Sequence, residues 1–416
     1  MKKIILSINA GSSSVKISVY SVDVGQRPVQ VAEATVSGLT AAPATLTYVR
    51  AGKTVSKDKE LSTKVHSQRD AFDVLLSTLV ADHELAQISS DDEIDLVCHR
   101  IVHGGDYDKS QLISDETYEH LEKLNDLAPL HNASSLAIVK ACLLKLPTAR
   151  NVACFDSQFH ASIPEHIRTY PINRDIARKN HLRKYGFHGI SYAFITRSTA
   201  EFLGKDPDKV NLIALHLGSG ASACAIKAGK SWDTSMGLTP LAGLPGATRS
   251  GSVDPSLVFH YASDVGKLSP SSTKELHISR AEEILNKESG WKALTGTTNF
   301  GIIANSDEPE MKLAFDLFVD RICGFIGSYY VSLHGQVDAL VFAGGIGEKS
   351  DCLRHAVVDQ VACLGFDIDE TANGAKMEKV VQDIGKAGAR QRVLVCSTDE
   401  QFEMARSCSE DRELWL

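Results

Sequence analysis

The chain has 416 residues, which is enough for two or three domains and for a large core that needs no disulfide or metal to fold. Hydrophobic residues make up 43% and charged residues 23% of the chain, and this composition excludes a mainly disordered, coiled-coil or collagen-like protein. The net charge of −8 argues against a general nucleic-acid binder, because such proteins are normally basic.

The apolar runs and the cysteines both indicate a cytoplasmic protein. No apolar run approaches the roughly 18 residues of a membrane span, so we expect no membrane partner. The apolar start at 4–8 is broken by Asn9 and Gly11, too early for a signal peptide. The nine cysteines are scattered without a C-x-x-C pair, which is typical of free thiols in a reducing compartment.

The first elements predict a β-hairpin. A strand at 4–8 and a half-buried strand at 15–19 flank the turn Asn-Ala-Gly-Ser-Ser-Ser (9–14). Half a chain later, the segment 212–226 repeats this pattern around a glycine turn at 216–220. Two similar hairpins at this separation predict two duplicated domains rather than an array of short repeats.

The rest of the chain predicts alternating strands and helices. A third glycine turn, 344–348, follows a strand expected at 339–343. Apolar residues at helical spacing predict helices over 71–85, 118–127, 133–146 and 311–333, and loop-like clusters are expected at 37–59 and 266–274. Such an alternation indicates an α/β architecture, with a domain boundary expected near 155–160.

The three glycine turns are candidates for phosphate binding. The first, 9–16, combines small residues, hydroxyls and Lys16, so backbone N–H groups and a point charge can surround an anion. It lacks the Walker A spacing, and a plain Ser-rich hairpin turn is the alternative. The turns at 217–222 and 344–348 are weak signals singly, because glycine usually serves backbone geometry. Together the three turns favour a nucleotide in a cleft between the domains.

Four charged or titratable side chains stand where ligands bind α/β proteins. Arg100 and Asp156 come after buried apolar runs, and the carboxyl edge of a sheet is the usual ligand site. Arg249 lies in a glycine-flanked loop that suits an anion, and His188 stands between two glycines. The alternatives are a surface arginine and a structural histidine. Since no zinc or G-x-S-x-G motif occurs, a metal would be a hard ion such as Mg²⁺.

Nine short motifs run through almost the whole chain. They are Asn-Ala-Gly-Ser-Ser-Ser-Val-Lys (9–16), His-Arg-Ile-Val-His-Gly-Gly (99–105), Pro-Leu-His-Asn (129–132), Phe-Asp-Ser-Gln-Phe-His (155–160), Tyr-Gly-Phe-His-Gly (185–189), His-Leu-Gly (216–218), Asp-Thr-Ser-Met-Gly (233–237), Thr-Arg-Ser-Gly (248–251) and Gly-Gly-Ile-Gly-Glu (344–348). In this order they strongly resemble the acetate kinase family, within the acetate and sugar kinase, Hsp70 and actin superfamily.

The resemblance implies two duplicated ribonuclease-H-like (actin-like ATPase) α/β domains of β-β-β-α-β-α-β-α topology, with a nucleotide cleft between them. It implies an N-terminal domain over 1–157, completed by 400–416, and a C-terminal nucleotide-binding and dimerisation domain over 158–399. The implied activity is reversible phosphoryl transfer between ATP and acetate, giving ADP and acetyl phosphate. The implied cofactor is Mg²⁺, with Mn²⁺ as a substitute, and the implied assembly is a cytoplasmic homodimer.

The resemblance also implies roles for individual residues. The catalytic set is Asp156, His188, Arg249 and Arg100, and the metal-binding set is Asn9 and Glu400. The acetate pocket is formed by Arg100, Val102, Leu130, Phe187 and Pro240. The nucleotide contacts Lys16, Ser14, His216, Leu217, Gly218, Ser219, Gly220, Gly345, Ile346, Gly347, Glu348 and Lys349. Because Val102 lies two residues past Arg100 on a strand-like segment, both side chains are expected to face one side.

Several positions depart from the family pattern, most of them on the nucleotide side. Ser219 replaces Asn, Ser252 replaces Asp, Tyr192 replaces His, Lys349 replaces Asn, and Phe300 and Ile302 lie where the family has Asp-x-Arg. A propionate kinase and a kinase with another phosphate donor therefore remain alternatives. An actin-like or Hsp70-like nucleotide switch is an alternative from another class. The two arginines and His188 argue against that class, because a switch needs no cationic pocket for a carboxylate.

Overall fold

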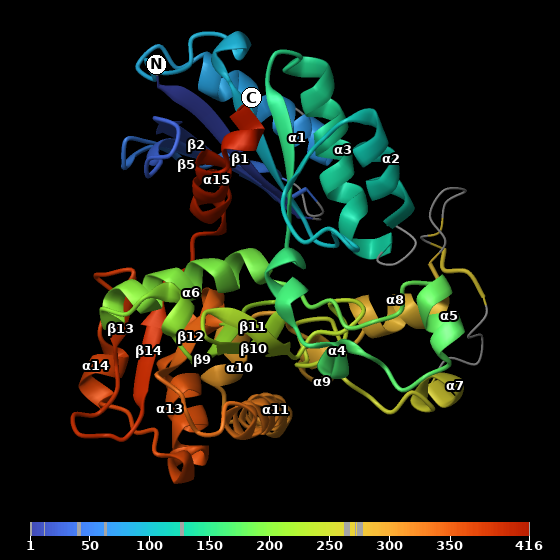
Figure 1. Cartoon of the computed structure of the whole chain (residues 1–416), viewed down its shortest axis with the longest axis vertical. Helices are drawn as coiled ribbons and strands as arrows, with labels where there is room; N and C mark the ends of the chain where they lie inside the picture. The colour runs from blue at the N-terminus through green and yellow to red at the C-terminus, as the bar shows by residue number, and fades with distance from the viewer. Residues whose placement is uncertain are drawn as a thin grey trace. The chain divides into compact units, whose positions relative to one another are not determined.

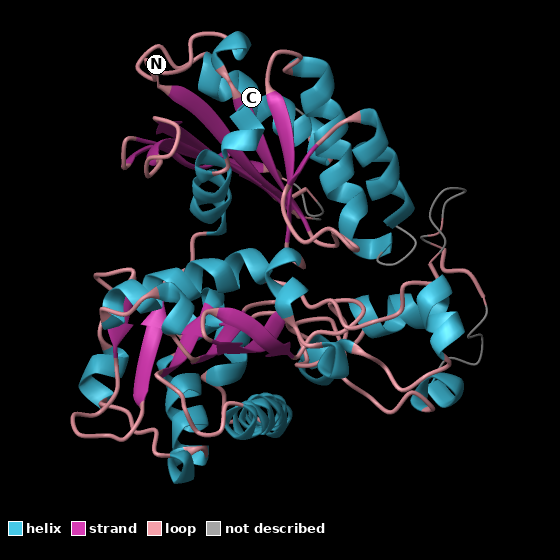
Figure 2. Ribbon diagram, viewed as in Figure 1, coloured by secondary structure: helices cyan, strands magenta, loops and turns pink. Residues whose placement is uncertain are grey.

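The structure is a computed structural model that describes residues 2–11, 13–39, 43–61, 65–124, 129–261, 267–270, 272 and 278–415, except the side chains of 129–131 and 261. The chain divides into two compact units (Figure 1). Unit 1 comprises Met1–Gln158 and Asp399–Leu416, and unit 2 comprises Phe159–Thr398. Each unit contains one β-sheet with helices packed on it (Figure 2).

The sheet of unit 1 has the strand order β5-β4-β3-β2-β1-β6-β8-β7. Its strands are β1 (Lys3–Ala10), β2 (Ser14–Val22), β3 (Val29–Ser37), β4 (Thr45–Arg50), β5 (Lys53–Glu60), β6 (Leu96–Ile101), β7 (Gln111–Leu112) and β8 (Arg150–Phe155). The neighbours β1, β6 and β8 run parallel, and the remaining pairs are antiparallel. The carboxyl ends of the three parallel strands therefore meet at one edge of the sheet.

Helices cover both faces of this sheet (Figure 1). The helices are α1 (Gln68–Val80), α2 (Asp115–Lys123), α3 (Pro129–Lys145) and α15 (Glu400–Glu410), with 3₁₀ turns at Asp91–Glu93 and Arg412–Trp415. Ile4, Leu6 and Ile8 share one core with apolar residues of α1 and α3. Since side chains alternate along a strand, the intervening Ser7 faces away from that core. Its carbonyl accepts a hydrogen bond from Gln401 of α15, which packs on the opposite face.

The sheet of unit 2 has the strand order β11-β10-β9-β12-β14-β13. Its strands are β9 (Leu212–Leu217), β10 (Ala221–Lys227), β11 (Lys230–Thr234), β12 (Ala339–Ala343), β13 (Val381–Asp383) and β14 (Arg392–Cys396). Here β9, β12 and β14 run parallel. The order matches β3-β2-β1-β6-β8-β7 of unit 1 strand for strand, with the same parallel and antiparallel pairs. The prediction of a duplicated α/β fold is therefore confirmed.

The long helix α11 (Pro309–Ser332) forms the main core of unit 2. Its residues Phe318, Ile322 and Ile326 are fully buried in one cluster with Ile213 and Leu215 of β9. The other helices are α4 (Glu165–Arg168), α5 (Arg174–Lys179), α6 (Gly189–Leu203), α7 (Leu257–Tyr261), α8 (Arg280–Lys287), α9 (Gly290–Thr295), α10 (Phe300–Ala304), α12 (Gly344–Lys349), α13 (Asp351–Gln360) and α14 (Glu370–Gly374). Short 3₁₀ turns occupy Gln158–Ser162, Pro207–Lys209 and Ala362–Leu364.

One predicted loop and one predicted turn are wrong where the structure describes them. The segment 37–59 contains β4 and most of β5, because Leu46 and Tyr48 of β4 alternate into the core. Strand β5 is the exposed edge of the sheet and carries three lysines, a composition that protects edges from further pairing. The turn predicted at 344–348 is the helix α12. The second predicted loop, 266–274, is described only at 267–270 and 272.

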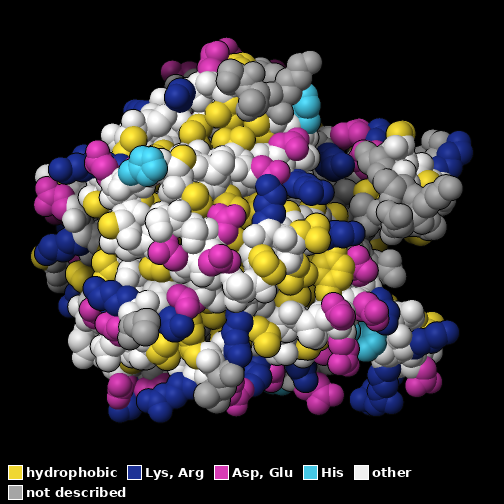
Figure 3. Space-filling view, turned by 90° about the horizontal axis from the view of Figure 1, so that it is seen from above, with side chains coloured by type: hydrophobic (Ala, Val, Ile, Leu, Met, Phe, Trp, Pro, Cys, Tyr) yellow, Lys and Arg dark blue, Asp and Glu magenta, His cyan; other side chains and the backbone are white. Residues whose placement is uncertain are grey.

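In the face drawn in Figure 3, basic and acidic side chains are interspersed. Among the described residues, no helix combines the length and the apolar character needed to cross a bilayer.

Candidate active site

The carboxyl edge of the unit 1 sheet gathers three polar side chains around Arg100, and two of them are Asn9 and Asp156. Asn9 is near the end of β1, Arg100 is near the end of β6, and Asp156 directly follows β8. The Arg100 guanidinium donates to both oxygens of Asp156, with Nη2 2.7 Å from Oδ2 and Nε 3.1 Å from Oδ1. Its Nη1 donates to Asn9 Oδ1 at 3.2 Å. This fork-shaped pairing fixes the guanidinium in one orientation.

Helix α15 adds a second carboxylate to this cluster. Glu400 is its first residue, and the preceding Asp399 caps the helix by accepting from the Phe402 amide. Glu400 Oε2 lies 3.5 Å from Arg100 Nε and 3.4 Å from Asn9 Nδ2. The cluster therefore joins a strand near the start of the chain to a helix near its end.

The predicted phosphate residues of the first hairpin lie beside this cluster. Lys16 is the register partner of Asn9 across β1 and β2, and its Nζ pairs with Glu33 Oε2 of β3 at 2.8 Å. Ser14 is half-buried at the start of β2. The hairpin is closed by a bond from the Gly11 amide to the Ser14 carbonyl. Lys16 thus extends the charged edge by one strand.

Burial shapes the electrostatics of this cluster. Asp156 is 1% exposed, and this burial raises the pKa of its carboxyl to about 6, against the lowering effect of Arg100 and with a further rise from Glu400. Burial lowers the pKa of Arg100, but the two carboxylates raise it by more, so the guanidinium stays charged. The cluster therefore combines one guanidinium with the carboxyl groups of Asp156 and Glu400.

The loop after β6 is tied down by residues of two predicted motifs. The His103 amide donates to Asn132 Oδ1, and Asn132 Nδ2 donates back to the His103 carbonyl, both at 3.0 Å. The expectation that Val102 lies on a strand with Arg100, facing the same side, is wrong. Strand β6 ends at Ile101, and Val102 lies in a half-buried bend where strand alternation does not apply. Leu130 belongs to α3, and its side chain lies outside the described residues.

The second candidate cluster lies at the carboxyl edge of the unit 2 sheet. After β9 the chain turns at 218–220, where the Gly218 amide donates to the Gly220 carbonyl. Gly344, which directly follows β12, has φ +75°, and a Cβ there would lie 2.8 Å from the Leu217 carbonyl oxygen. Only glycine fits that close approach, so the second and third glycine segments lie side by side.

Arg249 and His188 converge on the 218–220 turn. A Cβ placed on Gly220 would lie 3.0 Å from Arg249 Nη1 and 3.7 Å from His188 Nε2. The loop that carries Arg249 is fastened to the same turn, because the Ala247 amide donates to the Ser219 carbonyl at 2.8 Å. Ser219 therefore acts here through its backbone. The bare glycine faces two side-chain nitrogen atoms, an arrangement suited to phosphoryl oxygens where these atoms carry protons.

His188 is held in an irregular backbone position, as its flanking glycines suggested. Its φ is +58°, immediately before α6. The two residues before it are held by hydrogen bonds. The Gly186 amide donates to the Gly237 carbonyl, and His160 Nε2 bonds the Phe187 carbonyl at 2.9 Å. Phe187 is fully buried. Burial lowers the pKa of His160 to about 4, so His160 is a neutral structural residue.

The sequence analysis assigned no role to three hydroxyl residues around His188. Ser222 Oγ of β10 lies 2.9 Å from His188 Nδ1 and 2.6 Å from Tyr192 Oη. Ser191 Oγ lies 2.7 Å from His216 Nδ1. The rings of His188 and His216 are 4.2 Å apart. The departure noted at position 192 was the one available signal, because serines in a strand and in a helix look ordinary.

The remaining predicted nucleotide and pocket residues take varied positions. In α12, Gly345 and Lys349 are exposed, Gly347 is buried and Ile346 packs on the core of unit 2. Glu348 accepts bonds from Ser397 Oγ, the Thr398 amide and Thr398 Oγ1, which fasten the segment after β14. Pro240 is buried in the segment between β11 and Arg249.

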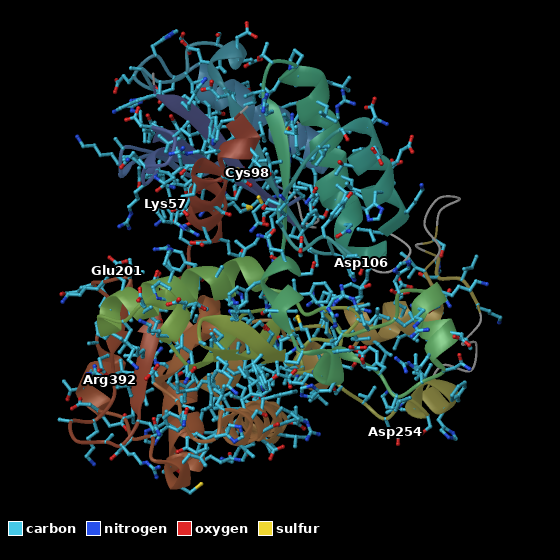
Figure 4. The ribbon with its side chains drawn as sticks, in the orientation of Figure 1. Lys57, Cys98, Asp106, Glu201, Asp254 and Arg392 are labelled. Atoms are coloured by element: carbon cyan, nitrogen blue, oxygen red, sulfur yellow. The ribbon has the colours of Figure 1, made fainter. Side chains whose placement is uncertain are left out.

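The residues around Arg100 fit a hard divalent cation. Asn9 Oδ1 and the carboxylate of Glu400 are the oxygen ligands that Mg²⁺ prefers, and the two carboxylates exceed the single guanidinium in charge. A separate group, Cys98, Cys154 and Cys408, places three sulfur atoms within 4.8 Å of one another. Cys98 lies against α15 (Figure 4), where its thiol contacts the Met404 carbonyl. Burial raises the pKa of this thiol, and a protonated thiol packs as a small apolar group.

Each unit thus carries charged or donor groups at the carboxyl edge of its parallel strands, and the two units repeat one α/β sheet order. Comparison with known proteins gives the family. The model of the acetokinase family matches residues 4–406, and the chain belongs to this family of carboxyl-group phosphotransferases.

Three known proteins illustrate the similarity. A Neurospora crassa protein named probable acetate kinase is 66% identical, over 100% of this chain and 95% of that protein. The crystal structure of Porphyromonas gingivalis acetate kinase is 32% identical with a TM-score of 0.81, over 100% of both chains. The crystal structure of a Francisella tularensis propionate kinase is 32% identical with a TM-score of 0.83, over 97% of this chain and 98% of that one.

Proposed function

We propose that this protein transfers the γ-phosphoryl group of ATP to acetate, reversibly, giving ADP and acetyl phosphate. The observation that carries the proposal is the convergence of Arg249 Nη1 and His188 Nε2 on the bare Gly220 of the 218–220 turn. Two nitrogen donors around a glycine turn suit the oxygens of a phosphoryl group in transfer. The curated and solved relatives named acetate kinase support acetate as the acceptor.

The reaction calls for charge and positioning rather than for a base. Acetate is ionised at neutral pH, since carboxyl pKa values lie near ~4, so its oxygen attacks without losing a proton. The barrier lies in bringing this anion to a polyphosphate, and phosphoryl transfer depends mainly on positioning and electrostatics. We assign Arg100 to the carboxylate, and Arg249 and His188 to the moving phosphoryl group. Asp156 orients Arg100 through its two hydrogen bonds and does not act as a base.

The proposal assigns Asn9 and Glu400 to Mg²⁺. When bound, the ion would neutralise charge on the phosphates of the nucleotide. Lys16, the 218–220 turn and residues 345–349 are assigned to the nucleotide. Titrating Mg²⁺ against activity in the wild type and in Glu400→Gln tests this, because the variant should need more Mg²⁺ for half-maximal rate. An unchanged requirement would remove Glu400 from the metal site.

The decisive experiment is a hydroxamate assay for acyl phosphate. Acetate and propionate are compared as acceptors, and ATP, GTP and pyrophosphate as donors. Acetyl phosphate formed from ATP, and lost in both Arg100→Ala and Arg249→Ala, is the expected result. Phosphate release from ATP without any acyl phosphate would instead favour the nucleotide-switch alternative.

A propionate kinase is the second candidate, because one of the similar solved structures has that name. A hydrophobic pocket discriminates one methylene by only about 1–3 kcal/mol, so propionate should react more weakly than acetate. If Val102 closes the pocket, Val102→Ala should raise kcat/KM for propionate relative to acetate. An unchanged ratio would remove Val102 from the pocket. Homodimer formation and a cytosolic location stay predictions of the sequence.

A further inference from the structure

A chain of hydroxyl groups leads from the first turn of α6 to His188. Tyr192 Oη lies 2.6 Å from Ser222 Oγ, and Ser222 Oγ lies 2.9 Å from His188 Nδ1. Ser222 is the register partner of His216 across β10 and β9. The Tyr192 and Ser222 side chains are fully buried. The Tyr192–Ser222 hydrogen bond is therefore shielded from bulk water, and the bond to His188 is part-buried.

The direction of the protons along this chain follows from Tyr192. In the part of the chain that the structure describes, its hydroxyl meets Ser222 Oγ and the backbone of His216. The His216 amide can only donate, so the tyrosine proton is directed to Ser222 Oγ. Burial raises the pKa of Tyr192, which keeps this proton in place. Ser222 Oγ then donates its own proton in a hydrogen bond to His188 Nδ1.

This order determines the tautomer of His188. A ring nitrogen that accepts a hydrogen bond carries no proton, so the neutral imidazole has its proton on Nε2. Nε2 is the nitrogen that lies near Gly220, together with Arg249 Nη1. The Nδ1–H tautomer would instead direct a lone pair of Nε2 toward this position and repel an anion.

We propose that Tyr192, acting through Ser222, holds His188 as the Nε2–H tautomer, so that Nε2–H donates to the phosphoryl group in transfer. Tyr192 and Ser222 are then positioning residues, and His188 is the group that touches the substrate. The inference rests on the proposed function for its catalytic meaning, but the tautomer itself is a property of the free protein.

Nitrogen NMR of the full-length protein with ¹⁵N-labelled histidine measures the tautomer directly. The His188 signals are identified by their loss in His188→Gln. The wild type should show a protonated Nε2 and an unprotonated Nδ1. Tyr192→Phe should populate both tautomers, because Ser222 Oγ becomes free to accept a proton from Nδ1. A wild-type Nδ1–H tautomer, or a Tyr192→Phe spectrum identical to the wild type, would overturn the proposal.

Kinetics test whether Tyr192 acts through Ser222. Complete loss of such a donor costs about 10²-fold in kcat, so partial loss in Tyr192→Phe should cost about 10-fold, with both KM values nearly unchanged. Tyr329→Phe is the matched control, because Tyr329 is equally buried on α11 and its hydroxyl meets no hydrogen-bond partner among the residues that the structure describes. This control should keep the wild-type kcat.

A double-mutant cycle completes the test. If Tyr192 acts only through Ser222, adding Tyr192→Phe to Ser222→Ala should cause no further loss of kcat. Fully additive losses would contradict the relay. If Ser222→Ala does not fold, the NMR comparison still decides the question. A protein that forms no acyl phosphate but shows the expected tautomers would refute the proposed function and leave the tautomer assignment standing.

Discussion

Replacing Arg100 by alanine should lower stability as well as abolish activity. The guanidinium donates two hydrogen bonds to Asp156, at 2.7 and 3.1 Å, and Asp156 is 1% exposed. Removing one partner of a buried ion pair leaves an uncompensated charge and costs about 3–5 kcal/mol. We expect a loss of about 3 kcal/mol, near the lower limit, because the remaining carboxyl can take up a proton.

The stability difference between the wild type and Arg100→Ala should depend on pH, because it depends on the pKa of Asp156. The pKa of Asp156 is already raised to about 6 by burial, and losing the Arg100 charge raises it further. A carboxyl whose pKa is higher in the folded state than the ordinary ~3.9 favours folding at low pH, and this contribution is lost as pH rises through the folded-state value. The stability gap between the wild type and Arg100→Ala should therefore be wider at pH 8 than at pH 5.

The assay is urea unfolding followed by circular dichroism at both pH values, with acyl phosphate formation measured in parallel. Adding Asp156→Asn to Arg100→Ala removes the buried charge, so the double variant should recover most of the stability and none of the activity. Equal stability of the wild type and Arg100→Ala at pH 8 would refute the argument. Turnover in the double variant would show that Arg100 does not bind a substrate.

Three further predictions follow from close contacts and burial. Gly220→Ala should fold normally but lose about 10²-fold in kcat, because its methyl group would lie 3.0 Å from Arg249 Nη1. Gly344→Ala should cost about 3 kcal/mol in urea unfolding, whereas Gly345→Ala, whose Cβ meets no atom within 4 Å, should cost little. Burial lowers the pKa of His160 from 6.5 to about 4, so this residue is neutral in the folded protein. Its contribution to the free energy of unfolding should be complete above pH 6.5 and should fall by about 2 kcal/mol by pH 5. In His160→Gln the free energy of unfolding should fall less between pH 6.5 and pH 5, and an equal fall in the variant would contradict this prediction.

Strands and helices could be predicted from the sequence wherever the spacing of apolar residues reflects which side chains are buried. Both hairpins and the strand 339–343 were found because their apolar residues are buried, as in β12, where every residue is. Strand β5 was missed because none of its residues is buried, so pairing with β4 rather than hydrophobic burial determines its structure. The glycines of 344–348 suggested a turn, but only Gly344 has a positive φ, and a helix begins there.

The candidate site was predictable where a charged residue followed a buried strand or stood beside glycines. Arg100 and Asp156 could be paired in advance, because parallel strands end at one edge. Ser222 could not, since a serine in a strand gives no signal until the partner helix places His188 beside it. The cluster of Cys98, Cys154 and Cys408 was hidden for the same reason, because β6, β8 and α15 are distant in sequence.

The two clusters lie at equivalent strand ends of the duplicated fold but differ in charge. Strands β1, β6 and β8 correspond to β9, β12 and β14, so each unit offers an equivalent edge. In unit 1 that edge carries Arg100 and the carboxylates of Asp156 and Glu400, side chains suited to a carboxylate substrate and a cation. In unit 2, Gly344 follows the equivalent of β6, and the nearby carboxylate of Glu348 is engaged by Thr398. Bare backbone and nitrogen donors then dominate, which suits phosphate oxygens. One scaffold, varied at equivalent strand ends, therefore presents different chemical groups in the two units.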